Sequence, residues 1–151
     1  MAERVKEVRY AIFYVIRNKE DPSKILIVKR PKDDNDIPNM WGIPAGSVKE
    51  GETYEEAIIR NGRNKLGVEL KVIKLIERGN LDRGSYILHG EEYEAEIVSG
   101  TPNVPQKDGE GTQYQDWKWG TYEDLIEASK RSSLCCNLYL KSIGEKVLGP
   151  I

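Results

Sequence analysis

The segment WGIPAGSVKEGETYEEAIIRNGRNKLG, residues 41–67, determines how the rest of the chain is interpreted. Gly46 and Gly51 indicate a tight loop, because glycine adopts backbone conformations that other residues rarely reach. Thr53 and Glu56 are spaced as in a capping box, the pattern that opens many helices. The segment therefore predicts the end of a strand, a glycine-containing loop and a helix in direct succession.

The predicted helix covers residues 54–66. Its apolar residues fit one buried stripe: Ala57, Ile58, Ile59 and Leu66. Gly67 is placed to end the helix in a left-handed conformation. Gly62 lies inside the helix, where glycine costs roughly 1 kcal/mol relative to alanine.

One side of this helix carries polar residues close to the loop. Residues three and four positions apart on a helix share a face, so Asn61, Asn64 and Lys65 lie in line with Ala57. The side nearest the glycine loop therefore presents amides and an ammonium group.

The spacing of glycine and charged residues in this segment resembles the signature of the Nudix hydrolases. Gly46 is followed after five residues by Glu52, and Glu52 after seven residues by Arg60, as in the first half of that signature. Gly67 closes the run. The resemblance implies that Glu52 and Arg60 are catalytic, that Gly46 lies against the substrate, and that the carbonyl of Ala45 is a metal ligand.

The second half of the signature departs from the family. Nudix hydrolases carry glutamates at the positions that match Asn61, Asn64 and Lys65, and those glutamates hold magnesium against a diphosphate. Magnesium prefers carboxylate oxygen, and a nearby ammonium group repels it. We therefore expect a site for Mg²⁺ or Mn²⁺ built from Ala45, Glu52, Asn61 and Asn64 to be weak or absent.

Cations near the loop predict an anion site instead. Arg30, at the end of a predicted strand, and Lys65 can replace part of the charge of a missing metal ion. We expect a diphosphate to bind between these two side chains and the loop at Gly46.

Composition limits the other classes of function. The chain has 151 residues, of which 38% are hydrophobic and 32% charged, as in one soluble domain over residues 1–151. A net charge of −2 argues against a nucleic-acid partner. No apolar run is long enough to span a membrane, so we expect a cytoplasmic protein. Cys135 and Cys136 are expected to be buried thiols. The sequence leaves open whether the protein forms a homodimer.

Extended segments are predicted at residues 7–16, 24–30, 41–43, 68–78, 85–98 and 116–119. We expect the first two to pair as a hairpin and the fourth to kink near Ile73. Residues 79–84 should turn the chain. The pair His89–Gly90 should interrupt the fifth segment, by either a bulge or a tight turn.

Two helices are expected near the C-terminus. Thr121 should cap the first, over residues 121–130, and Ser132 or Ser133 should start the second, which ends near Val147. Strands mixed with helices predict an α/β fold with a mixed sheet covered on both faces. The resemblance implies the α/β/α sandwich of the Nudix proteins.

Residues 99–115 form a long polar loop, of the kind that often carries function. The resemblance suggests Asp108 or Glu110 as a further metal ligand or base, although a solvated loop is the simpler interpretation. His89 is expected to be a packing or surface residue. The tryptophans are expected mainly in the core: Trp41, Trp117 and Trp119.

Three hypotheses follow for function. The favoured one is a protein that binds a nucleotide or another diphosphate-linked small molecule, with metal-dependent hydrolysis weak or lost. The first alternative is an active magnesium-dependent pyrophosphohydrolase that uses Glu52 and other acids such as Glu55, Asp108 or Glu110. The second alternative is a non-enzymatic interaction module.

Overall fold

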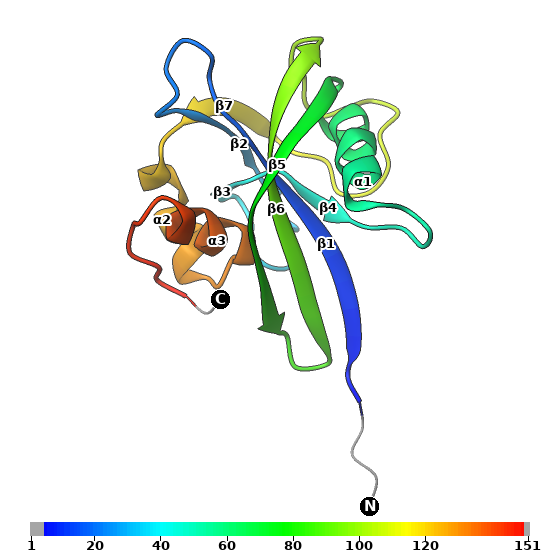
Figure 1. Cartoon of the computed structure of the whole chain (residues 1–151), viewed down its shortest axis with the longest axis vertical. Coiled ribbons are helices and arrows are strands. Elements are labelled where there is room, and N and C mark those ends of the chain that lie inside the picture. The colour runs from blue at the N-terminus through cyan, green and yellow to red at the C-terminus, as the bar shows by residue number, and fades with distance from the viewer. Residues whose placement is uncertain (1–4, 150–151) are drawn as a thin grey trace, which may run out of the picture.

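The computed structural model describes residues 5–149 and consists of two β-sheets with helices on both sides (Figure 1). The strands are β1 (Glu7–Ile16), β2 (Ile25–Lys29), β3 (Trp41–Gly42), β4 (Ala45–Ser47), β5 (Glu69–Asp82), β6 (Tyr86–Ser99) and β7 (Asp116–Gly120). The helical elements are α1 (Tyr54–Asn61), the π-helical turn η1 (Gly62–Leu66), the 3-10 turn η2 (Tyr122–Leu125), α2 (Ile126–Lys130) and α3 (Leu134–Ser142). None of the helices in this range is both long enough and apolar enough to cross a membrane.

The larger sheet is mixed, as predicted. Its strand order is β4-β1-β6-β5, and β1 runs parallel to β6 while the other neighbours are antiparallel. The smaller sheet has the order β3-β2-β7 and is antiparallel. In Figure 1, α1 lies on one side of the larger sheet, and α2 and α3 lie on the other. The glycine loop connects β4, an outer strand of this sheet, to α1.

The prediction that β1 and β2 pair as a hairpin is wrong. The two strands belong to different sheets and are joined through an isolated bridge between Arg17 and Ile25. β1 already has β4 and β6 on its two edges, and β2 has β3 and β7. The short turn between these two apolar segments therefore connects the central strands of two different sheets, and the two strands are not neighbours in one sheet.

Alternate side chains of β1 and β2 point into separate cores. The first core lies under α3 and includes Phe13, Val15, Ile25, Ile27, Leu134 and Leu138. The second core lies under α1 and includes Ile12, Tyr14, Leu26, Val28, Ile58 and Leu66. Residues 12–16 of β1 and most of β2 are covered on both faces, and these stretches are almost continuously apolar, whereas residues 7–10 of β1 are exposed.

The hairpin of β5 and β6 is longer than predicted. β5 continues to Asp82, so the turn expected at residues 79–84 begins later. A register shift between Val72 and Lys74 confirms the kink near Ile73. β6 runs through His89–Gly90 without a break, so both the bulge and the turn predicted there are wrong.

Close packing explains the glycine in β6. A Cβ atom at Gly90 would lie 2.3 Å from Cε2 of Phe13 on the neighbouring strand. Glycine at this position therefore makes room for an aromatic ring, and it does not interrupt the strand.

The C-terminal helices differ from the prediction in detail. Thr121 and Asp124 form a capping box, and η2 followed by α2 covers the helix predicted for residues 121–130. Ser133 precedes α3, as predicted, but α3 ends at Ser142, and the expected end near Val147 is wrong. Gly144 has a φ of 75°, a left-handed conformation that does not continue a helix.

Candidate functional site

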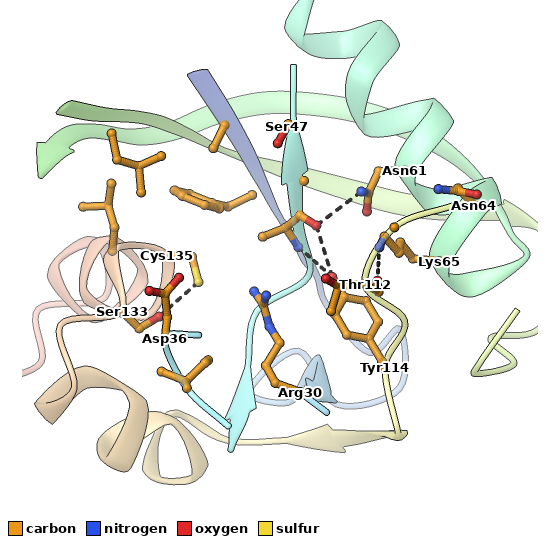
Figure 2. A pocket seen from close by; sticks show the side chains of 18 of the residues that line it. Arg30, Asp36, Ser47, Asn61, Asn64, Lys65, Thr112, Tyr114, Ser133 and Cys135 are labelled. Atoms are coloured by element: carbon orange, nitrogen blue, oxygen red, sulfur yellow. Dashed lines mark hydrogen bonds between the residues drawn. The ribbon is translucent and has the colours of Figure 1, made fainter. Parts of the chain in front are cut away.

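A cavity of about 540 Å³ lies between β1, β4, the end of α1 and the start of α3 (Figure 2). Its polar lining includes Arg30, Lys49, Arg60, Asn61, Asn64 and Lys65. The structure thus brings the predicted residues Arg30 and Lys65 to the same cavity as Ala45 and Gly46. The predicted polar face of the helix also points to this cavity.

Glu52 and Arg60, in the first half of the Nudix signature, stabilise the glycine loop. Arg60 donates from Nε to Oε2 of Glu52 at 2.8 Å and from Nη2 to Oε1 at 3.0 Å. The same Nη2 donates to the carbonyl of Ser47, and the backbone N–H of Lys49 donates to Glu52. The hydrogen bonds from Arg60 hold the pKa of Glu52 below its usual value. Glu52 and Arg60, predicted as catalytic, are therefore paired with each other across the loop.

The start of the helix matches the sequence pattern. Thr53 accepts a hydrogen bond from the backbone of Glu56, and the Glu56 carboxylate accepts one from the backbone of Thr53, which confirms the capping box. Gly62 is required by packing, because a Cβ atom there would lie 2.5 Å from Cδ1 of Leu70. Gly67 ends the helical segment with a φ of 71°, as predicted.

The carbonyl of Ala45 already has two hydrogen-bond donors. It accepts from Nδ2 of Asn61 at 3.2 Å and from the hydroxyl of Tyr114 at 3.1 Å (Figure 2). That hydroxyl also accepts from the Ala45 backbone N–H. A Cβ atom at Gly46 would lie 2.2 Å from Nδ2 of Asn61, so glycine is needed for this contact.

Asn61 is a buried structural contact. It is 2% exposed, and its Oδ1 accepts a hydrogen bond of 2.7 Å from the hydroxyl of Tyr14 on β1. Burial raises the pKa of Tyr14 well above its usual value, so this hydroxyl keeps its proton and acts as the donor. Asn61 thus links β1 to the carbonyl of Ala45.

Asn64 and Lys65 hold the loop at residues 109–113 against the helix. Asn64 donates to the carbonyl of Glu110 at 2.9 Å and accepts from its backbone N–H at 2.6 Å. Nζ of Lys65 donates to the carbonyl of Thr112 (Figure 2). These side chains, expected on the metal-facing side of the helix, bind the backbone of the same protein.

Positive charge is concentrated around Lys65. Burial, followed by the charges of Arg30 and Arg60, lowers the pKa of Lys65 to about 8. Lys65 is only 7% exposed. Arg30 lies near the middle of the cavity, where Nη1 is 3.5 Å from Asp34 and Nη2 donates to the carbonyl of Ile43. An anion in this region would reduce the repulsion among these cations.

The residues present do not fit a magnesium or manganese ion on this face. Ala45, Asn61 and Asn64 each accept hydrogen bonds through the oxygen that the resemblance assigns to the metal. Glu52 is occupied by Arg60, and the Lys65 ammonium group lies beside them. Within residues 5–149, no cluster of three or more histidine, cysteine, aspartate or glutamate side chains is arranged to hold a metal ion.

Other candidates from the sequence lie partly outside the cavity. Glu110 lines it and its carboxylate is 3.5 Å from Nζ of Lys49, whereas Asp108 is exposed and is not among the lining residues. His89 contacts Asn80 and Glu91 on the α1 side of the sheet. The tryptophans pack partly against the two cores and do not line the cavity: Trp41, Trp117 and Trp119.

Tyr14, Thr112 and Tyr114 were not identified from the sequence. Tyr14 looked like any other aromatic residue in a buried strand, and the other two lie in a polar loop with no motif. Each contacts the motif across about 47 to 69 positions of the chain, so no local spacing indicates it.

The comparison with protein families decides the identity of the fold. The model of the NUDIX domain matches residues 7–134. The chain belongs to the Nudix family. The match therefore confirms the family that the glycine loop and helix of this Nudix protein suggested.

Sequence relatives have Nudix names. A nucleoside triphosphatase NudI from Escherichia coli is 26% identical over 123 residues, which cover 78% of this chain and 87% of that protein. An NAD-capped RNA hydrolase NudC from Pseudomonas aeruginosa is 28% identical over 123 residues, 78% of this chain and 42% of that protein. A putative nudix hydrolase 1 from Caenorhabditis elegans is 32% identical over 62 residues, 41% of this chain and 16% of that protein. The Nudix chain thus spans less than half the length of the last two relatives.

Solved structures confirm the α/β/α sandwich. A NUDIX hydrolase from Nitrosomonas europaea superposes with a TM-score of 0.70 at 15% identity, covering 96% of this chain and 94% of that one. A MutT NUDIX hydrolase from Burkholderia pseudomallei superposes with a TM-score of 0.64 at 24% identity, covering 80% and 88%. At these identities the likeness concerns the fold alone.

Proposed function

We propose that this Nudix protein binds the diphosphate group of a nucleotide or of another diphosphate-linked small molecule without a divalent metal ion. Hydrolysis of such compounds is then weak or lost. The observation that carries the proposal is the ammonium group of Lys65, which lies at the cavity where a metal-binding carboxylate would be expected.

The charges around the cavity support an anionic ligand. Arg30, Arg60 and Lys65 all line it, and the lowered pKa of Lys65 reflects their mutual repulsion as well as burial. A diphosphate placed among them would gain charge-assisted hydrogen bonds and would favour the charged form of Lys65. Cationic side chains would thus supply attraction that Mg²⁺ supplies elsewhere.

Calorimetry with inorganic pyrophosphate tests this proposal. In the presence of EDTA, pyrophosphate should bind the unmodified protein, and Lys65→Met should weaken binding about tenfold or more, since a charge-assisted contact is worth about 1.5–3 kcal/mol. Lys71→Met is the matched control, because Lys71 is exposed on β5 and does not line the cavity. Binding that requires Mg²⁺, or binding that Lys65→Met leaves unchanged, would overturn the proposal.

An active metal-dependent hydrolase is the second candidate. It is supported by the relative named as a nucleoside triphosphatase, of which the chain covers 87%, and by the acids Glu52 and Glu110 near the cavity. A screen with Mg²⁺ and Mn²⁺ should cover nucleoside triphosphates, dinucleoside polyphosphates, nucleotide sugars and dinucleotide cofactors. Turnover that disappears in Glu52→Gln would establish this candidate in place of the first.

A further inference from the structure

Tyr114, which follows the loop at residues 109–113, lines the cavity beside two of its cations. The centroid of its ring is 5.5 Å from Cζ of Arg30 and 5.9 Å from Nζ of Lys65. In Figure 2 the ring lies between these two side chains. Tyr114 is only 2% exposed, so its ring meets both positive charges largely out of water, where cation–π contacts are strongest.

The hydroxyl group of Tyr114 fixes the ring in place. It accepts a hydrogen bond of 3.0 Å from the backbone N–H of Ala45 and donates one of 3.1 Å to the carbonyl of the same residue. Burial raises the pKa of Tyr114, so the hydroxyl group keeps the proton that the second bond needs. The ring is thereby tied to the residue before Gly46, next to the proposed site of the diphosphate.

Hydrogen bonds alone do not satisfy the two cations. Within residues 5–149, Nε of Arg30 is buried and has no hydrogen-bond partner. Lys65 donates to the carbonyl of Thr112, although an ammonium group has three donors. The ring of Tyr114 therefore compensates part of the charge of two side chains that repel each other.

Other contacts between a cation and a ring lie at the surface. Tyr86 contacts the exposed Arg9 at 4.0 Å, and Trp41 contacts the partly exposed Lys118 at 4.5 Å. Neither of these rings lines the cavity. Tyr114 differs from both in its burial, in the number of its cations and in its place at the site.

We infer that Tyr114 is a positioning residue for the diphosphate: its ring holds the guanidinium group of Arg30 and the ammonium group of Lys65 at the cavity before the anion binds. The inference rests on the proposed function. Side chains that are already fixed in the arrangement of the complex lose less freedom when the ligand arrives, which raises its affinity. The two cations contact the anion, and Tyr114 acts through them.

Calorimetry with pyrophosphate in EDTA tests the inference on variants of Tyr114. Tyr114→Leu keeps an apolar side chain but removes the ring, and it should weaken binding about fivefold or more. Tyr114→Phe loses the hydroxyl group but keeps the ring, so the affinity should change by less than about twofold. Tyr139→Leu is the matched control, because Tyr139 is buried in the first core and does not line the cavity.

A fluorinated ring and a pH profile separate positioning from packing. A trifluorinated phenylalanine at position 114 has nearly the shape of phenylalanine, but fluorine withdraws electron density from the ring. Pyrophosphate should therefore bind about threefold more weakly than to Tyr114→Phe. In Tyr114→Leu, loss of the ring should also lower the pKa of Lys65, so the affinity should fall at a lower pH than in the unmodified protein. A role in packing alone would change neither quantity.

The outcomes separate this inference from the proposed function. Failure of pyrophosphate to bind the unmodified protein without metal would overturn both. If pyrophosphate binds, but the leucine and fluorinated variants bind it as well as Tyr114→Phe does, the role of the ring is wrong and the proposed function stands. Equal losses in Tyr114→Phe and Tyr114→Leu would assign the effect to the hydroxyl group and overturn the inference. Circular dichroism shows whether each variant folds, and the fluorinated variant decides the question if Tyr114→Leu does not.

Discussion

The two halves of the Nudix motif lie on one helical segment but are used differently. In the first half, Glu52 and Arg60 bind each other and the loop between them, over eight positions of the chain. In the second half, Asn64 and Lys65 bind the backbone of a loop 46 and 47 positions away. One half thus orders its own loop, whereas the other holds a distant segment against the cavity.

This difference shows that the helix face next to the glycine loop makes contacts within the chain. Carboxylates clustered on one face repel one another unless a cation binds between them. Amides and an ammonium group need no such ion, and here they meet backbone oxygens directly. The position of the helix can therefore be kept while the chemistry of its face changes.

The largest effect is expected when the second half is changed to the family pattern. Asn61→Glu, Asn64→Glu and Lys65→Glu combined should create or raise magnesium-dependent pyrophosphohydrolase activity by about a hundredfold or more. Metal ions stabilise the developing charge and activate water, and each 1.36 kcal/mol corresponds to about tenfold in rate. Phosphate release with Mg²⁺ over the nucleotide screen measures the change.

The triple variant should also be less stable without metal, because it loses the contacts to Ala45, Glu110 and Thr112. Thermal unfolding with and without MgCl₂ should show stabilisation by the ion. The corresponding triple glutamine variant is the control, since it is uncharged. A folded glutamate variant that stays inert, beside an active unmodified protein, would place the catalytic residues elsewhere.

A substitution in the first half of the Nudix motif should lower the stability of the fold. Glu52→Gln should lower the free energy of unfolding by about 2 kcal/mol at pH 7, because it disrupts a bidentate, charge-assisted pair. Urea unfolding measures this loss, with Glu55→Gln in the exposed first turn as control. Pyrophosphate binding should change by less than about twofold, which is smaller than half a kcal/mol.

The pH dependence of the Glu52 effect has a definite sign. The pKa of Glu52 is lower in the folded protein than its ordinary value of 4.5, so the pair stabilises the fold above that value. The contribution is lost as the pH falls through the lowered pKa. The difference between the unmodified protein and Glu52→Gln should therefore narrow in acid, and a constant difference would contradict the ion pair.

A smaller effect is expected from the protonation of Lys65. Its pKa of about 8 in the free protein means that it loses charge as the pH rises through that value. Pyrophosphate affinity should therefore fall about fivefold between pH 7 and pH 9, by linkage of proton and ligand binding. Lys65→Arg, which stays charged, should show a flatter profile. Equal profiles for the two proteins would mean that Lys65 does not bind the anion.

The smallest effect concerns the loop at residues 109–113. Asn64→Ala should cost less than about 1 kcal/mol of stability, because its two hydrogen bonds are exposed. Hydrogen exchange should accelerate at the amide of Glu110, whose N–H loses its acceptor. Asn64→Asp keeps that acceptor and should protect the same amide, so equal acceleration in both variants would contradict this contact.

Features set by neighbouring residues could be predicted from the sequence. The capping box at Thr53 and Glu56, the end of the helix at Gly67 and the kink near Ile73 each depend on a few adjacent positions. Features set by distant neighbours could not. Gly90 appeared to interrupt a strand because its actual partner, the ring of Phe13, lies 77 positions earlier in the chain.

The same distinction applies to the site. Arg30 and Lys65 were identified as cations near the glycine loop, and the structure places both at one cavity. The contacts of Tyr14 and Tyr114 with Asn61 and Ala45 arise only when separate strands and loops come together. The sequence shows amides and a lysine at positions where the Nudix signature has glutamates, but it does not show which groups these side chains contact.

The alternation of β1 and β2 between the first and second cores has a consequence for how the protein denatures. Neither core can melt while the other keeps these strands in place, since each strand contributes to both. We therefore expect a single cooperative transition, even though the sheets are separate. Trp41 packs against the first core and Trp117 against the second, so variants that retain one of these two fluorophores should report the same midpoint in urea.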